Sequence, residues 1–169
     1  MDDQQWQGGW EGLFAPALVA FVLAVGATVY FYTVWREERR VGQAAREAAA
    51  LQQSPRSFTP SELRAYRGAD ASRPLLLAIK GRVLDVSRGA EFYGVGGPYN
   101  VMAGRDASRA FAMMSLKEED AHADLSGVPE NHLSILDDWY NKLTAKYPTC
   151  GYVLAEAAEG DQAAPRKAA

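Results

Sequence analysis

The sequence predicts a small α+β domain behind a single N-terminal transmembrane helix. Three observations lead to this: an uncharged stretch at 12–35, two β-prone runs at 74–89, and an amphipathic helical pattern at 129–147. The chain has 169 residues and a formal net charge of only -3, which disfavours nucleic acid as a partner. Its one cysteine, Cys150, excludes a disulfide within the chain and favours a reducing compartment.

Residues 12–35, GLFAPALVAFVLAVGATVYFYTVW, predict the transmembrane helix. A helix rises about 1.5 Å per residue, so this stretch spans a hydrocarbon core of about 30 Å with some tilt. A buried core helix would show a polar stripe, and this one has none. A cleaved signal peptide would begin with basic residues, whereas MDDQQWQGGWE carries only acids. The pattern therefore indicates an uncleaved membrane anchor.

Charge predicts the orientation of this anchor. No Lys or Arg precedes the stretch, and four arginines follow it closely: Arg36, Arg39, Arg40 and Arg46. The positive-inside rule then places the C-terminal domain in the cytosol and leaves residues 1–11 as a short non-cytosolic N-terminus. A ridge of small residues (Ala20, Ala24 and Thr28) is of the kind that packs membrane helices together, so a homodimer is one expectation.

The segments on either side of the domain differ from it in composition. Residues 36–56 begin with REERRVGQAAREAAALQQ, which is rich in helix formers and predicts a helical stalk that breaks near Pro55. Residues 155–169 lack aromatic side chains and have almost no branched apolar ones, so they predict a disordered tail. Between them, residues 57–154 are enough for one small core.

The domain opens with a short helix and a hairpin. Thr59 as N-cap, Pro60 at the first helical position and Glu62 form a capping box, and Gly68 follows the helix. The runs PLLLAIKG and RVLDVSRG then predict two strands joined at Lys80-Gly81.

Two further helices and a strand complete the domain. In RDASRAFAMM, Asp106 is a plausible N-cap for a helix. Residues 129–147 predict the long helix, and CGYVL at 150–154 predicts the last strand. The apolar residues of the long helix fall on one face: Leu133, Leu136, Tyr140 and Leu143.

Most catalytic motifs are absent, so an enzyme is not expected. The sequence has no P-loop and no G-x-S-x-G motif. His122 and His132 lack partners at metal-ligand spacing and are expected on the surface, while Cys150 is expected to be a packed thiol. Two tyrosines remain in the glycine-rich loop EFYGVGGPYN, and composition alone favours a turn whose tyrosines cap the core.

Longer motifs resemble a known family. FTPSELRAYRG, LLLAIKGRVLDVSRG and FYGVGGPYNVMAGRDASRAFA are similar to the membrane-associated progesterone receptor component family, whose plant members are described as membrane steroid-binding proteins. The resemblance covers residues 57–154 and extends to the anchor and stalk. It implies a cytochrome b5-like haem-binding domain, a small mixed sheet with short helices, behind one membrane helix.

The resemblance also implies a haem site. Ordinary cytochrome b5 holds haem between two histidines, one of them in a His-Pro-Gly-Gly motif that this sequence lacks. In the resembling family one tyrosinate binds the iron of a ferric, five-coordinate haem b, and by position this is Tyr99. Tyr93 matches a tyrosine that hydrogen-bonds near the haem, and Lys146 and Tyr147 match a pair at the propionate edge. The loop departs from the family pattern at Val95, Gly96 and Asn100, none of which is a proposed haem contact.

The function implied is that of a haem-binding partner or regulator of membrane enzymes, such as cytochrome P450s or sterol-modifying enzymes, at the endoplasmic reticulum. The alternative is a steroid- or sterol-binding adaptor that uses the same aromatic loop without haem. An electron carrier of the cytochrome b5 type is disfavoured because the paired histidines are missing.

Overall fold

The computed structural model describes residues 11–154, with side chains from Pro16 onward. Residues 1–10 of the predicted N-terminal segment and the predicted tail at 155–169 lie outside the described residues. The chain divides between Arg39 and Arg40 into two compact units. Helix α1 (Glu11–Gln53) contributes residues to both units.

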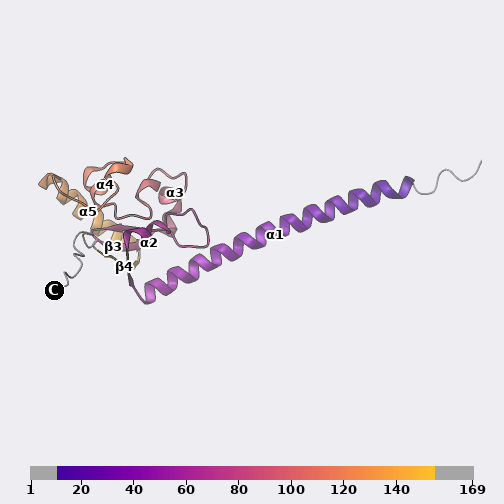
Figure 1. Ribbon diagram of the computed structural model, residues 1–169, viewed down its shortest axis with the longest axis horizontal. Helices are drawn as coiled ribbons and strands as arrows, with labels where there is room; N and C mark the ends of the chain where they lie inside the picture. Colours follow the sequence, from indigo (N-terminus) through magenta and orange to yellow (C-terminus); the bar gives the residue numbers. More distant parts are fainter. Residues whose placement is uncertain (1–10, 155–169) are drawn as a thin grey trace, which may run out of the picture. The chain divides into compact units, whose positions relative to one another are not determined.

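The first unit contains the apolar part of α1 (Figure 1). Within the described residues, Pro16–Gln53 is one helix long and apolar enough to cross a membrane. The Thr28 hydroxyl donates a hydrogen bond of 2.7 Å to the carbonyl of Ala24, which leaves no polar group of that side chain unsatisfied in an apolar setting. The guanidinium of Arg39 lies 3.9 Å from the centroid of the Trp35 ring, an arrangement suited to a membrane interface.

The second unit is built on a four-stranded mixed sheet. Its strands are β1 (Arg56–Phe58), β2 (Leu76–Ile79), β3 (Arg82–Asp85) and β4 (Thr149–Val153), in the order β1-β4-β3-β2. β1 runs parallel to β4, and the other neighbours are antiparallel. The predicted hairpin is confirmed: Lys80 and Gly81 both have positive φ, as a two-residue turn between twisted strands requires.

Four short or medium helices accompany the sheet. They are α2 (Pro60–Arg64), α3 (Ala90–Tyr93), α4 (Ser108–Met113) and α5 (Glu130–Lys146). α3 and α4 lie on the same side of the sheet in Figure 1. The predicted capping box of α2 is confirmed, since the Thr59 side chain accepts from the Glu62 amide and the Glu62 side chain accepts from the Thr59 amide. The α+β class is therefore as predicted.

Both faces of the sheet are buried, which explains the continuous apolar run in β2. Leu77 and Ile79 join a cluster with α3, α4 and α5, while Leu76 and Ala78 join a second cluster on the other face. Successive side chains of a strand point to opposite faces, so a strand covered on both sides needs apolar residues at every position.

The end of α1 belongs to the core of the second unit. Ala48 and Leu51 are each only 7% exposed. The Tyr66 hydroxyl donates to Glu47 at 2.6 Å, and the Gln52 side chain donates to Asp85 at 3.1 Å. The compact unit thus begins at Arg40, ahead of the predicted domain start at residue 57, and the last turns of the predicted stalk pack against the domain.

The prediction that Asp106 is the N-cap of the next helix is wrong. α4 begins at Ser108, and its N-cap residue is Ala107. The Asp106 carboxylate accepts from the amide of Gly81 at 2.8 Å and from that of Ser108 at 3.0 Å. Asp106 therefore ties the β2–β3 turn to the start of α4, a long-range contact that local spacing does not reveal.

The two histidines, His122 and His132, differ in their exposure to solvent. His122 is exposed, as predicted, and its Nδ1 accepts from the Asp124 amide at 3.1 Å. His132 is half-buried, and its Nδ1 is a buried atom without a hydrogen-bond partner among the described residues, so the prediction of a surface position is wrong for this residue. Cys150 is fully buried as predicted, and burial raises the pKa of its thiol to about 12.

Candidate functional site

Three tyrosines from separate parts of the chain converge at one end of the larger cluster. Tyr93 ends α3, Tyr99 precedes the 3₁₀ turn Asn100–Met102, and Tyr147 follows α5. The Tyr93 ring centroid lies 5.9 Å from that of Tyr99 and 6.3 Å from that of Tyr147. The fold thus brings together the three tyrosines singled out in the sequence.

The loop between Tyr93 and Tyr99 is fixed by its own backbone. The amide of Tyr99 donates to the carbonyl of Phe92 at 2.8 Å, and the two rings stack with centroids 6.2 Å apart. Gly97 is required at this close approach, because a Cβ there would lie 2.5 Å from the Phe92 oxygen. The Asn100 side chain adds a hydrogen bond of 3.0 Å to the Tyr93 carbonyl. The loop between Tyr93 and Tyr99 therefore has a defined conformation.

A glycine that the sequence reading did not single out makes room for Tyr147. A Cβ on Gly89 would lie 2.5 Å from the Tyr147 hydroxyl oxygen and 3.4 Å from the Tyr93 ring. Gly89 lies in the 3₁₀ turn Ser87–Gly89, directly before α3. The missing side chain lets the two tyrosines approach the same space from opposite segments.

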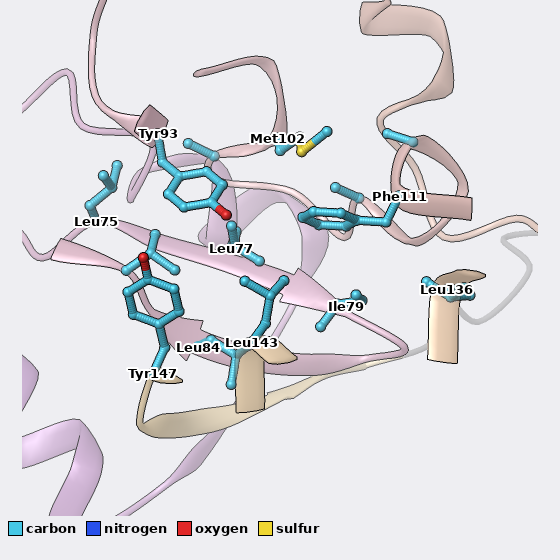
Figure 2. Close-up of a cluster of buried hydrophobic side chains, with 14 of the residues drawn as sticks. Leu75, Leu77, Ile79, Leu84, Tyr93, Met102, Phe111, Leu136, Leu143 and Tyr147 are labelled. Atoms are coloured by element: carbon cyan, nitrogen blue, oxygen red, sulfur yellow. The ribbon is translucent and has the colours of Figure 1, made fainter. Parts of the chain in front are cut away.

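The tyrosines border an apolar interior (Figure 2). Figure 2 shows Tyr93 and Tyr147 reaching into one cluster from different elements, and Leu77 of β2 and Phe111 of α4 belong to the same cluster. Tyr93 is 6% exposed and Tyr147 3% exposed, whereas Tyr99 is 38% exposed. The site therefore has two buried phenols and one that reaches the surface.

Burial strengthens the preference of Tyr93 for its neutral form. It raises the pKa of this phenol to about 12, and the neighbouring Tyr147 and Tyr99 add to the effect. Tyr93 is therefore a neutral phenol at physiological pH and can donate a hydrogen bond. Lys146 is exposed, and its ammonium group lies 5.1 Å from the centroid of the Tyr147 ring. The ammonium group of Lys146 thus lies at the surface, next to the ring of the buried Tyr147.

The three hydroxyls have no hydrogen-bond partner among residues 16–154, in contrast to the Tyr66 hydroxyl, which contacts both Glu47 and Arg56. These hydroxyls are therefore available to a ligand with polar edges at this end of the apolar cluster. Within the searched part of the chain, no three His, Cys, Asp or Glu side chains group as a metal site. The phenols of Tyr93, Tyr99 and Tyr147 are candidate oxygen ligands at this end of the cluster. This donor set fits a haem, since tyrosine is an established ligand type for haem iron.

Comparison with known proteins agrees with this geometry. Residues 59–154 match the family model described as a cytochrome b5-like heme/steroid binding domain, which is more than half of the chain. The chain belongs to this family. The solved structure of a hypothetical protein of Arabidopsis thaliana with a cytochrome b5-like fold is 48% identical, with a TM-score of 0.55. It covers 59% of this chain and 91% of its own length, so the predicted cytochrome b5-like fold is confirmed.

The relatives of this cytochrome b5-like protein carry related names. Probable steroid-binding protein 3 of Arabidopsis thaliana is 49% identical over 58% of this chain and 98% of its own length. Membrane steroid-binding protein 2 of Arabidopsis thaliana is 45% identical, and the chain spans only 45% of its length. Membrane-associated progesterone receptor component 2 of Homo sapiens is 38% identical over 87% of this chain and 68% of its own length. The family resemblance seen in the sequence is therefore confirmed.

Proposed function

We propose that the tyrosine cluster binds haem b, with the phenolate of Tyr99 as the single protein ligand of the iron. The observation that carries this proposal is the convergence of three tyrosine rings, whose hydroxyls have no hydrogen-bond partner among residues 16–154, at one end of the apolar core in a domain of the heme/steroid binding family. The proposal assigns each tyrosine a different role, according to its exposure.

Tyr99 is the candidate iron ligand because it is the most exposed of the three. A negative charge is opposed by burial, and this phenol reaches the surface, where a phenolate is less costly. Its position is fixed by the hydrogen bond to the Phe92 carbonyl and by stacking on the Phe92 ring. A preorganised ligand loses little conformational entropy on binding.

Tyr93 is the candidate hydrogen-bond donor. Its raised pKa keeps the proton on the phenol, so it can donate to an oxygen atom but would not compete as an anionic ligand. Lys146 and Tyr147 would bind the propionate edge, where the exposed ammonium group can pair with a carboxylate. Haem, if bound here, would supply an iron that a hard phenolate ligand favours in the ferric state.

The function follows from the site and the anchor together. We infer that the protein is a membrane-anchored, non-enzymatic haem protein that acts as a partner or regulator of membrane enzymes such as cytochrome P450s. Support comes from the helix that is apolar enough to span a membrane and from relatives named as membrane proteins. The arginines after the apolar segment favour a cytosolic domain, at the endoplasmic reticulum by resemblance. Association into a homodimer through the small residues of α1 belongs to the same proposal.

A second candidate function is steroid or sterol binding without haem. The name of the family and those of several relatives include steroid binding, which favours it. Replacement of Tyr99 distinguishes the two functions, because Tyr99→Phe removes the oxygen ligand and leaves the apolar surface almost unchanged.

The test is a titration of the full chain in lipid nanodiscs with ferric haem, followed by absorption spectroscopy. We expect saturable one-to-one binding with a high-spin phenolate spectrum, and loss of that spectrum in Tyr99→Phe. Tyr152→Phe is the matched control, since Tyr152 is exposed and lies in β4, outside the cluster. Equal behaviour of both variants, or no binding by the wild type, would refute tyrosinate ligation and leave the steroid function to be tested.

A further inference from the structure

The aromatic loop carries exposed apolar side chains that the haem proposal does not use. Val95 is 75% exposed and Phe92 is 41% exposed, and neither is one of the four proposed haem contacts. The Phe92 ring stacks on that of Tyr99, which is itself 38% exposed. Phe92 and Tyr99 thus form one exposed aromatic surface, and Val95 lies at the turn between them. We call Phe92 and Val95 the loop tip.

The loop lies against a segment that contacts α1. A Cβ on Gly68 would lie 3.9 Å from the amide nitrogen of Val95, so residues 66–70 pass beside the loop tip. In the same segment, the Tyr66 hydroxyl donates a hydrogen bond of 2.6 Å to the Glu47 carboxylate of α1. Residues 66–70 therefore connect the loop to the part of α1 that belongs to the second unit.

Arg40 brings this end of the second unit close to the apolar part of α1. Two hydrogen bonds from Ser72 are the main reason why the pKa of the Asp70 carboxyl is lowered, and the charge of Arg40 adds to the effect. Arg40 follows Trp35, the last residue of the uncharged stretch, by five residues, or about 7.5 Å of helix. The covalent chain therefore keeps Asp70 and the neighbouring loop within reach of a bilayer crossed by α1.

The charges beside the loop nearly balance. Arg67 and Arg88 are exposed, and so is Glu91. None of the ion pairs formed among the described residues involves these three. Two cations and one anion give the loop no strong preference for charged lipid, whereas the apolar side chains of the tip gain free energy by leaving water. Apolar burial is therefore the driving force that this surface offers to a partner.

We propose that Phe92 and Val95 insert into the surface of the bilayer that anchors the chain. Phenylalanine and aliphatic side chains bury apolar surface at the boundary of headgroups and acyl chains. Attachment through α1 makes the contact intramolecular, so two side chains can be enough to hold the loop at the lipid surface. The proposal does not depend on haem, since neither side chain is one of its proposed contacts. A second copy of the chain is the competing occupant, which the test distinguishes.

The test uses the full chain without haem, one copy per phosphatidylcholine nanodisc, with a fluorescent thiol probe. The native Cys150 is fully buried and the pKa of its thiol is about 12, so it should not react, and wild type is the blank for labelling. Val95→Cys carries the probe at the loop tip. Leu154→Cys is the matched control, because Leu154 is apolar and 49% exposed. Its neighbour Val153 donates to the carbonyl of Gly81, in the hairpin turn at the opposite end of β3 from α3.

Lipid with a nitroxide near the headgroup end of its acyl chain reports contact by quenching the probe. We expect quenching at position 95 to exceed that at position 154 at least about threefold, and to persist in about 1 M salt because apolar burial is not screened. Equal quenching at the two positions, or its loss in high salt, would overturn the proposal. So would probe–probe contact at position 95 in discs that hold two chains, without lipid quenching in discs that hold one, because a second copy would then cover the tip.

Matched variants of Val95 test the apolar contact itself. The probe is moved to Glu91→Cys, an exposed position on α3, so that position 95 can be changed. Val95→Asp should lower the quenching of this probe at least about threefold, because a carboxylate resists transfer out of water, and Val95→Leu should retain it. If Val95→Asp and Val95→Leu give equal quenching, the side chain at the tip does not enter the bilayer and the proposal is wrong.

Discussion

The side-chain amide of Asn100 donates a hydrogen bond of 3.0 Å to the backbone carbonyl of Tyr93. This contact closes the loop that carries both loop tyrosines. The loop geometry therefore depends on a side chain that would not itself touch the ligand.

Replacement of Asn100 should loosen this loop. We expect Asn100→Ala to lower the free energy of unfolding by about 1 kcal/mol, the net value of one hydrogen bond, and to weaken ferric haem binding as the loop becomes less ordered. Urea unfolding and haem titration measure the two effects. Asn141→Ala, at an exposed position of α5, is the control. Unchanged haem affinity in Asn100→Ala would show that the hydrogen bond does not organise the site.

Gly89 and Tyr147 should be coupled energetically. Gly89→Ala places a methyl group 2.5 Å from the Tyr147 hydroxyl, so we expect a loss of about 1–3 kcal/mol of stability from overpacking. In a Tyr147→Phe background that oxygen is absent, and the cost of Gly89→Ala should fall below about 1 kcal/mol. A double-mutant cycle by urea unfolding measures the coupling. Strictly additive effects would argue against this contact.

The phenol of Tyr93 should lose its proton at a higher pH than an ordinary tyrosine. Its pKa is raised from 10.0 to about 12 in the folded protein, so the folded state keeps the phenol proton where the unfolded state has lost it. The stability that Tyr93 contributes is therefore fully present below pH 10 and declines as the pH rises from 10 to about 12. Burial and the hydrogen bond to Glu47 also raise the pKa of Tyr66, so ultraviolet difference titration should show two late tyrosines in the wild type and one in Tyr93→Phe. An unchanged number of late tyrosines in that variant would contradict the prediction for Tyr93.

The capping box of α2 should make the free energy of unfolding depend on pH in the acid range. The Thr59 amide and hydroxyl donate to Glu62, which holds the pKa of its carboxyl below the usual 4.5. A lowered pKa contributes stability that is present above 4.5 and is lost as the pH falls through the folded value. Glu62→Gln should therefore be less stable than wild type at pH 7, with the difference narrowing below pH 4.5. Glu119→Gln, at an exposed position, should show no such narrowing.

Local features of the fold were predictable because neighbouring residues encode them. The capping box at Thr59 and the turn at Lys80-Gly81 depend on a few adjacent residues, and the structure has both. Asp106 was assigned to the nearest helix, although its carboxylate also accepts from Gly81, 25 residues away in the chain. Leu51 lies in an alanine-rich segment typical of an exposed stalk, so its burial could not be recognised from composition.

The candidate site was predictable only in part. The family resemblance pointed to Tyr93, Tyr99 and Tyr147, which the structure brings together. The contribution of Gly89 was missed because it depends on the approach of Tyr147 from a segment that is 58 residues away in the chain.

The position of β4 has a consequence for how the chain matures during synthesis. Among the strands of residues 11–154, β4 is the last to be synthesised, yet it lies between β1 and β3 and pairs with both. Until Thr149–Val153 leaves the ribosome, β1 has no partner and the sheet is limited to the β2–β3 hairpin. The apolar part of α1 emerges much earlier, so the nascent chain can be tethered to a bilayer before its sheet can close. A chain that ends before Thr149 would therefore leave β1 and one edge of β3 without a partner strand.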